Sequence, residues 1–191
     1  MNKYLIDPYT GYWEPEFAIN HHIHSQKVSD WIINFLKNEK ETLVYDFGCG
    51  MGSYLNDLYN NGFTSLIGVE MKPPKNDYPF EIKSQNLAEP FDFVKKGNVI
   101  SLEVGEHIPD LHMDNFLNNI TSHCSNYLIL SWAVRNQGGF GHFNELNNDE
   151  VIPHVINRGF QYLEEESMDI RKDIEPNYWY FKNTIMIFKK I

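Results

Sequence analysis

Two kinds of hydrophobic pattern alternate along the chain. Short, mostly apolar runs at 43–47, 66–69, 80–84, 98–104 and 127–134 predict buried strands. Between them, apolar residues recur every three or four positions, which predicts helices near 26–36, 53–60, 113–120 and 151–156 that pack one face on a sheet. Because strands and helices alternate, the pattern predicts a doubly wound, Rossmann-like α/β fold with a mostly parallel sheet.

The C-terminal part of the chain departs from this alternation. Residues 160–163 and 184–188 are predicted to form an antiparallel pair that closes the sheet. Before them, Pro153 is expected near the first turn of a helix, where a missing N–H costs least, and Gly159 is expected to end that helix. The aromatic run at 178–181 is expected either to pack on the core or to form a second wall of a ligand cleft.

The strand at 43–47 leads into a glycine-rich turn of the pattern D-x-G-x-G-x-G and then into a helix. Alternate glycines permit a tight turn and let a ligand approach the bare backbone, while the helix N-terminus supplies free N–H groups. The dinucleotide fingerprint G-x-G-x-x-G does not fit, because Ser53 stands where its last glycine would be. The turn therefore suits a nucleotide-like ligand other than a dinucleotide.

Two carboxylates narrow the choice of ligand. Asp46, beside the turn, would repel a pyrophosphate but suits a ligand that carries an ammonium group. Glu70 ends the next apolar run, twenty residues beyond Gly50, where an acid can bind ribose hydroxyls. S-adenosylmethionine carries an ammonium group and a ribose but no phosphate, so it satisfies both.

At this point the stretch resembles motif I and the following acidic strand end of class I S-adenosylmethionine-dependent methyltransferases. The resemblance implies S-adenosylmethionine as cofactor, seven strands with the last inserted antiparallel, and in-line methyl transfer from the sulfonium to a nucleophile. Residues 101–109 also resemble the fourth-strand motif of small-molecule members. The residues assigned to the cofactor on these grounds are Asp46, Gly48, Cys49, Gly50, Gly52, Glu70, Met71, Asn86, Leu87 and Glu103. Asn86 replaces the commoner acid, and an amide there is also an ordinary turn residue.

Histidines supply the candidate general bases for proton removal from an acceptor, in the order His107 or His142, then His22. His107 and Glu106 are alternatively expected only to orient their loop and cap the next helix. The loop at 135–145 combines glycines with hydrogen-bonding side chains after a strand, which suits a polar, hydroxylated acceptor. The candidate acceptor-binding residues are Trp132, Arg135, Asn136, Asn144 and His24.

These motifs together predict an enzyme that methylates a hydroxyl of a small polar molecule, such as a sugar or glycan. One alternative keeps the chemistry and changes the acceptor to a nitrogen or carboxylate of a small metabolite, or to an RNA base. A second alternative is a cofactor-binding module that regulates a partner without catalysis. The three readings share the cofactor and differ in what lies beside it.

Composition limits the partners. The chain has 191 residues, which predicts one domain over 1–191, and its net charge of −10 disfavours nucleic acid as a partner. The two cysteines show no metal or redox spacing. No apolar run is long enough to span a membrane and no apolar signal region opens the chain, so a cytoplasmic setting is expected.

Residues 1–24 are rich in Tyr, Trp, Pro and His and have no clear period. Tyr9, Tyr12, Trp13 and Phe17 predict that this segment packs on the body, either covering a sheet edge or acting as a lid that excludes water from the transfer. The cluster of His21, His22 and His24 invites a metal interpretation, but no nearby Cys or Asp completes a familiar spacing. We therefore expect no bound metal there.

Overall fold

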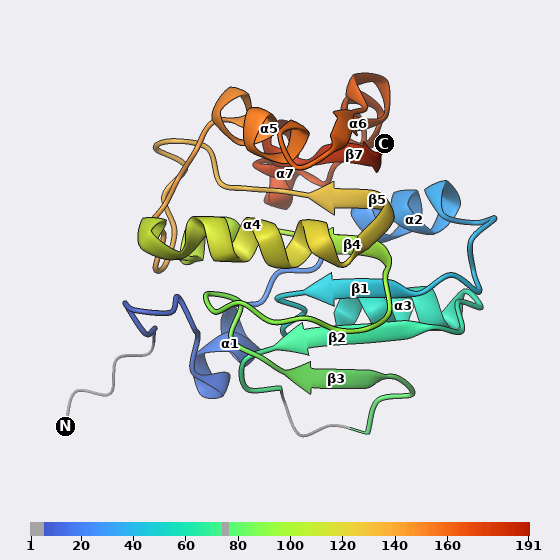
Figure 1. The fold of residues 1–191 in the computed structure, drawn as a ribbon, viewed down its shortest axis with the longest axis horizontal. Helices are drawn as coiled ribbons and strands as arrows, with labels where there is room; N and C mark the ends of the chain where they lie inside the picture. The colour runs from blue at the N-terminus through green and yellow to red at the C-terminus, as the bar shows by residue number, and fades with distance from the viewer. Residues whose placement is uncertain (1–5, 74–76) are drawn as a thin grey trace.

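The computed structural model describes residues 6–73 and 77–191. Its strands form one seven-stranded sheet of order β3-β2-β1-β4-β5-β7-β6 (Figure 1). The sequence prediction of a mostly parallel sheet is confirmed, because β1 to β5 pair in parallel and β7 pairs antiparallel with both β5 and β6. The strands are β1 Val44–Phe47, β2 Leu66–Glu70, β3 Glu81–Ser84, β4 Gly97–Ser101, β5 Cys124–Leu130, β6 Phe160–Tyr162 and β7 Met186–Lys190.

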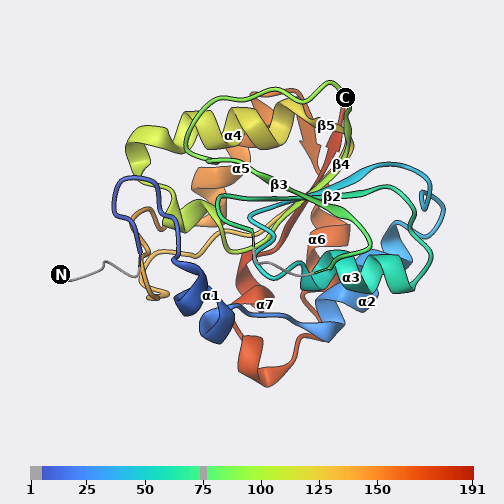
Figure 2. The same cartoon turned by 90° about the horizontal axis from the view of Figure 1, so that it is seen from below.

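Helices cover both faces of this sheet (Figure 2). One face packs on apolar residues of α4 and α5, and the opposite face packs on α2, α3 and α6. Ser25 caps α2 as its sequence position predicts, because its hydroxyl accepts the N–H of Val28 at 3.2 Å. The helices are α1 Pro15–His21, α2 Gln26–Phe35, α3 Ser53–Asn60, α4 Met113–Ser122, α5 Asn148–Ile156, α6 Glu164–Ile170 and α7 Phe181–Thr184.

Two strands end earlier than the apolar runs predict. β4 ends at Ser101 rather than at residue 104, because Glu103 adopts a left-handed φ of 53° and the chain turns into a short 3-10 helix, Gly105–His107. β5 ends at Leu130 rather than at 134, since Leu130 pairs with the last residue of β4 and nothing continues the ladder. The segments that follow β4 and β5 therefore leave the sheet at the same edge.

The position of Pro153 corrects a sequence prediction. We expect this proline near the first turn of its helix, but α5 begins at Asn148, so Pro153 lies in the helix interior. The helix starts early because Asn147 and Glu150 form a reciprocal capping box, which satisfies the first N–H groups. Without an N–H, Pro153 cannot make the helical hydrogen bond to residue 149.

The N-terminal segment packs on the body, as its aromatic residues predict. Tyr12 is buried, and an isolated bridge joins Ile6 to Trp13 ahead of α1. Tyr9 departs from the prediction, because 79% of its surface is exposed at the tip of the turn. In the part of the chain that the structure describes, every helix is too short or too polar to cross a membrane.

Candidate functional site

A cavity of about 470 Å³ lies at the carboxyl ends of β1, β2 and β4, within the size range of small-molecule sites. The N-terminal segment, the loop after β5 and residues 179–181 complete its wall, and Figure 1 shows α1 on the side toward which β1 and β2 point. Ligands of parallel α/β sheets bind at this edge. Of the residues predicted to bind the cofactor, those that line the cavity are Gly48, Gly50, Glu70, Met71, Asn86, Leu87 and Glu103.

The glycine turn after β1 brings bare backbone to the cavity. The Gly48 N–H donates to the Val69 carbonyl at 2.8 Å, which anchors the turn to β2. Gly50 has a φ of 51°, and a Cβ there would lie 1.6 Å from the ring of His22. Only glycine fits at this position, for reasons of both conformation and space. Cys49 and Gly52 belong to the same turn but are buried away from the cavity.

Glu70 fixes the turn against the end of β2. One carboxylate oxygen accepts the Gly50 N–H at 3.0 Å, and the other accepts the Met71 N–H at 2.8 Å. Burial raises the pKa of Glu70, and these two amide hydrogen bonds offset part of that rise. The carboxylate is thus held in one orientation at the cavity wall, where it can accept further hydrogen bonds from hydroxyl groups.

Asp46 does not line the cavity, in contrast to its predicted contact with the ligand's ammonium group. Its side chain is buried, and its Oδ2 accepts no hydrogen bond from any described residue. Burial, with a smaller effect from the charge of Glu70, raises the pKa of Asp46 to about 8. Burial therefore favours the neutral form of this carboxyl.

The segment after β4 brings two more acids to the site. Glu103 is held by its backbone N–H, which donates to Ser131 Oγ at 2.7 Å, and by its Oε2, which accepts from Gln137 Nε2 at 2.7 Å. Glu106 is fully buried, and neither of its carboxylate oxygens accepts a hydrogen bond within the described part of the chain. Burial, followed by the neighbouring Glu103 carboxylate, raises the pKa of Glu106 well above its usual range.

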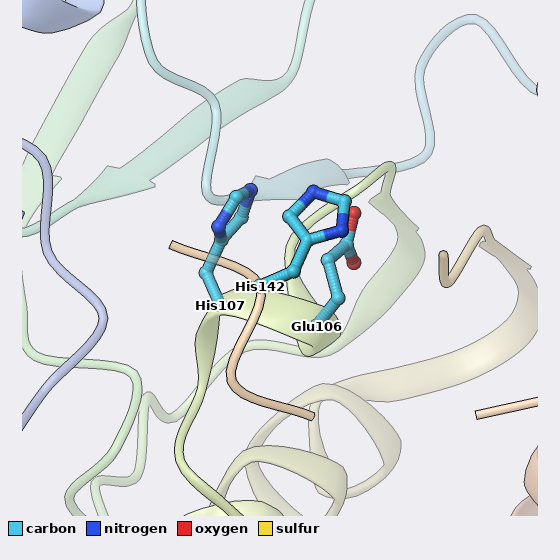
Figure 3. Close-up of side chains that lie close together, drawn as sticks. All are labelled: Glu106, His107 and His142. Atoms are coloured by element: carbon cyan, nitrogen blue, oxygen red, sulfur yellow. The ribbon is translucent and has the colours of Figure 1, made fainter. Parts of the chain in front are cut away.

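His107 and His142 meet at the cavity, although they lie on different loops (Figure 3). Their ring centroids are 5.0 Å apart and their planes cross at 80°. The Nδ1 of His107 is 3.1 Å from the Gly141 carbonyl, and the Nδ1 of His142 is 2.9 Å from Glu145 Oε1. Because a carbonyl or carboxylate oxygen only accepts, both Nδ1 atoms carry a proton, and no described residue forms a hydrogen bond with either Nε2.

The two histidines differ in electrostatic environment. Burial, and then the charge of His142, lowers the pKa of His107 to about 4, so His107 is neutral at pH 7. His142 instead donates to Glu145, whose other hydrogen bonds come from the backbone N–H groups of Asn136 and Gly138, each at 2.7 Å. Burial alone would raise the pKa of Glu145, but these hydrogen bonds outweigh it and the net shift is downward. Glu145 is therefore an anion that orients His142.

The three N-terminal histidines have separate surroundings. His22 is exposed toward the cavity above Gly50, and the protein atoms around its ring lower its pKa by desolvation. His21 also lines the cavity and stacks on Phe17 with ring centroids 3.9 Å apart. His24 lies outside the cavity, where its Nε2 contacts Asp57 Oδ2 at 2.8 Å and Ser29 Oγ at 3.1 Å.

The other residues predicted to bind the acceptor also lie outside the cavity lining. Trp132 is fully buried beneath Gly105, and its Nε1 donates to the Asn144 carbonyl at 2.6 Å. This hydrogen bond links the two ends of the loop after β5. Arg135 is exposed and donates two hydrogen bonds to Glu150, at 2.8 and 2.6 Å. Asn136 is exposed in the turn and has a φ of 68°. The loop itself reaches the cavity through residues 137–140 and 142.

Sequence reasoning missed several cavity residues. Tyr12 and Trp13 belong to a segment whose packing is predicted but whose target is not, and Tyr54 reads as part of the apolar stripe of α3. Tyr180 lines the cavity as the second wall that the aromatic run allows. The sequence predicts that Asn86 either contacts the ligand or stabilises a turn. It lines the cavity, and its Oδ1 also accepts the Ala88 N–H at 3.0 Å. The sequence signal that could have indicated these residues is the number of aromatic side chains in residues 1–24 and just after the glycine turn.

Comparison by sequence finds no matching family model and no matching curated protein. Comparison by structure finds magnesium protoporphyrin IX methyltransferase from Synechocystis with bound S-adenosylmethionine, at TM-score 0.64 and 19% identity over 87% of this chain and 79% of that one. The N-methyltransferase NodS from Bradyrhizobium japonicum, in complex with S-adenosylhomocysteine, matches at TM-score 0.64 and 13% identity over 86% of both chains. A sugar N-methyltransferase from Streptoalloteichus matches at TM-score 0.69 and 11% identity over 92% of this chain and 91% of that one.

Proposed function

We propose that this chain, which has the fold of class I S-adenosylmethionine-dependent methyltransferases, transfers a methyl group from S-adenosylmethionine to a hydroxyl of a small polar acceptor such as a sugar. The observation that carries the proposal is one cavity that joins the glycine turn and Glu70 to the pair of histidines His107 and His142. The glycine turn and Glu70 suit an adenosyl ribose, and a histidine can accept a proton. Methyl transfer needs the cofactor site and the base next to each other.

The residues present fit the cofactor. Glu70 is held with its carboxylate at the cavity wall, and Gly50 lines the same cavity with the His22 ring packed directly against it. Glu103 belongs to the cavity wall, and its buried Oε1 accepts no hydrogen bond from the described residues, so an ammonium group could be a partner for this carboxylate. When bound, the cofactor supplies an electrophilic methyl group on a positively charged sulfur. The protein's part is to orient the acceptor and to remove one proton.

His142 is the better proposed base of the two histidines. Its Nδ1–H is bonded to the Glu145 carboxylate, which stabilises the cation formed when Nε2 accepts a proton. His107 faces only a carbonyl at Nδ1, and its low pKa makes it a weak proton acceptor. His142 Nε2 would take the proton of the acceptor hydroxyl as that oxygen received the methyl group, and the sulfonium would supply the leaving group as a neutral thioether.

The cofactor is tested by calorimetry with S-adenosylmethionine and S-adenosylhomocysteine. Glu70→Ala should weaken binding by about 10- to 100-fold, since one to two hydrogen bonds to a charged group are lost. Glu89→Ala is the matched control, because Glu89 is exposed and outside the cavity. No binding by the folded native chain, or equal weakening by both variants, would contradict the proposal.

The acceptor class is tested by turnover. Panels of sugars, amino sugars, small amines and carboxylic acids are screened for production of S-adenosylhomocysteine, and the methylated atom is identified by NMR. On the true acceptor, His142→Ala should lower kcat by about 10²- to 10⁴-fold while cofactor binding is retained. Methylation at a nitrogen would replace the hydroxyl acceptor by the amine alternative. Full turnover of His142→Ala would remove this histidine as the base.

A further inference from the structure

Glu106, His107 and His142 bring three metal-ligating atoms together beside the cavity. One carboxylate oxygen and one ring nitrogen from each histidine all lie within 4.8 Å of one another. Figure 3 shows the three side chains extending side by side, with the His142 ring between the other two. All three residues belong to the cavity wall, with His107 and His142 in front and the Glu106 carboxylate buried behind them.

The state of Glu106 indicates that a partner is missing from this cluster. Its side chain is completely buried, and both carboxylate oxygens lack a hydrogen-bond partner among the described residues. A buried carboxylate without a partner is strongly unfavourable, so such groups are usually protonated, paired with a cation or bound to a metal. The Glu103 carboxylate also lies beside Glu106, so two acids face the same corner of the site.

The histidines are already oriented as metal ligands are. In metal sites, a ligating histidine usually donates its second ring N–H to a carboxylate or a backbone carbonyl. His107 Nδ1 bonds to the Gly141 carbonyl at 3.1 Å, and His142 Nδ1 bonds to the Glu145 carboxylate at 2.9 Å. These hydrogen bonds leave the Nε2 lone pair free on each ring.

We propose that Glu106, His107 and His142 bind one divalent first-row transition-metal ion, such as Zn²⁺, Mn²⁺ or Co²⁺, through two imidazole nitrogens and one carboxylate. This ligand set is used by catalytic metal sites, which keep further positions open for water or substrate. Magnesium and calcium prefer all-oxygen sites, so two histidines disfavour them. With metal–ligand distances of about 2.1 Å, bound ligand atoms would be about 3.3 Å apart, which the side chains reach by moving roughly an ångström.

The ion's part in the reaction, unlike the site itself, rests on the proposed function. A metal-bound hydroxyl has a much lower pKa than a free one, so an acceptor on the ion would release its proton to water without a histidine as base. The ion would also occupy the lone pair of His142 Nε2. A metal role and a base role therefore compete for this atom, and metal removal separates them.

Metal binding is tested on the full chain without any cofactor. The protein is stripped with a chelator, dialysed and titrated with Zn²⁺ by calorimetry, and Co²⁺ binding is followed by its visible absorption. One ion should bind per chain, and Glu106→Gln and His142→Gln should each weaken binding by at least about 100-fold, since each removes a direct ligand. His154→Gln, a histidine of α5 outside the cavity, is the control and should bind Zn²⁺ like the native chain.

Circular dichroism shows whether each variant is folded, and a second ligand variant replaces one that is not. Absence of Zn²⁺ and Co²⁺ binding to the native chain would overturn the site. Unchanged affinity in a folded Glu106→Gln variant would overturn it as well. Cofactor binding by the stripped protein is measured separately, so failure of the metal site is distinct from failure of the methyltransferase proposal. Turnover that survives metal removal would overturn the ion's part in the reaction and leave His142 as the base.

Discussion

At the scale of single residues, burial decides what the acids of this chain can do. Glu70 is buried but receives two backbone N–H groups, so its carboxylate is well defined at the cavity wall. Asp46 is buried with an oxygen that accepts no hydrogen bond from any described residue, and its pKa rises to about 8. Two acids that look alike in the sequence therefore differ in ionisation in the fold, because desolvation favours the neutral carboxyl unless hydrogen bonds stabilise the carboxylate.

Asp46→Asn should therefore change the pH dependence of stability. Its pKa lies above the usual value of an unfolded aspartate, about 3.9, so its contribution to stability is present below pH 4 and is lost as the pH rises to about 8. The free energy of unfolding of the variant, minus that of the native chain, should rise by up to about 1.4 kcal/mol per pH unit in this window and level off above it. Urea unfolding at several pH values measures this difference.

The control for this measurement is Asp110→Asn, since Asp110 is exposed. A difference that stays flat for Asp46→Asn from pH 4 to 8 would show that the carboxyl is ionised throughout. Taking the difference between variant and native chain cancels the other titrating groups, because both proteins contain them.

At the scale of elements, the N-terminal segment with α1 closes one side of the cavity. Trp13 has its ring centroid 4.9 Å from that of His107 and 6.1 Å from that of His22, so it touches both the cluster and the residue above the glycine turn. Gly11 fits against the His107 carbonyl, where a Cβ would be only 1.9 Å from the oxygen. Sequence predicts that this segment packs, and the structure shows that it packs on the site.

Trp13→Ala tests this segment as a lid. Loss of the ring removes contacts at the cavity wall and should weaken cofactor binding by about tenfold, which corresponds to roughly 1.4 kcal/mol. Because the segment lies outside the sheet, the main unfolding transition should change less than binding does. Dissociation rates measured by stopped flow, with melting curves beside them, check both expectations.

Tyr9→Ala is the matched control for the lid, since this aromatic side chain belongs to the same segment but is 79% exposed. It should leave dissociation unchanged. Equal effects of the two substitutions, or none from Trp13→Ala, would mean that the segment only covers a sheet edge.

At the scale of the whole molecule, charge separates the proposed small acceptor from an RNA base. The net charge is −10, and binding to a nucleic acid backbone requires an excess of Lys and Arg at the contact. The cavity wall supports the same choice, since Lys72 is its only Lys or Arg among the described residues while Glu70, Glu103 and Glu106 all belong to it.

We therefore expect no appreciable RNA binding. Fluorescence anisotropy with a labelled single-stranded RNA at physiological salt should give a Kd weaker than about 10⁻⁴ M, the weak end of non-specific binding. A basic RNA-binding protein serves as the positive control for the probe. Tighter binding that falls steeply with added salt would contradict the expectation and revive the RNA acceptor.

Features that depend on residues close together in the chain follow from the amino-acid sequence alone. The alternation of strands and helices, the glycine turn after β1 and the place of Glu70 follow from short-range patterns, since hydrophobic periodicity and glycine conformation act within a few residues. Parallel strands align their carboxyl ends, so the pairing of Glu70 with Gly50 could also be predicted from two adjacent strand ends. Boundaries were less certain, as β4 and Pro153 show, because a ladder or a cap beyond the run decides where an element stops.

Which loop residues face the cavity depends on long-range packing in the folded chain. His107 and His142 lie 35 positions apart in sequence, and nothing local brings them to one point with Glu106. The same loop turns Trp132 inward as a support and Arg135 outward to Glu150, although both are plausible ligand-binding side chains. Side-chain direction in an irregular loop is set by packing against other elements and by the need to satisfy buried polar groups, and neither has a period that the sequence reveals.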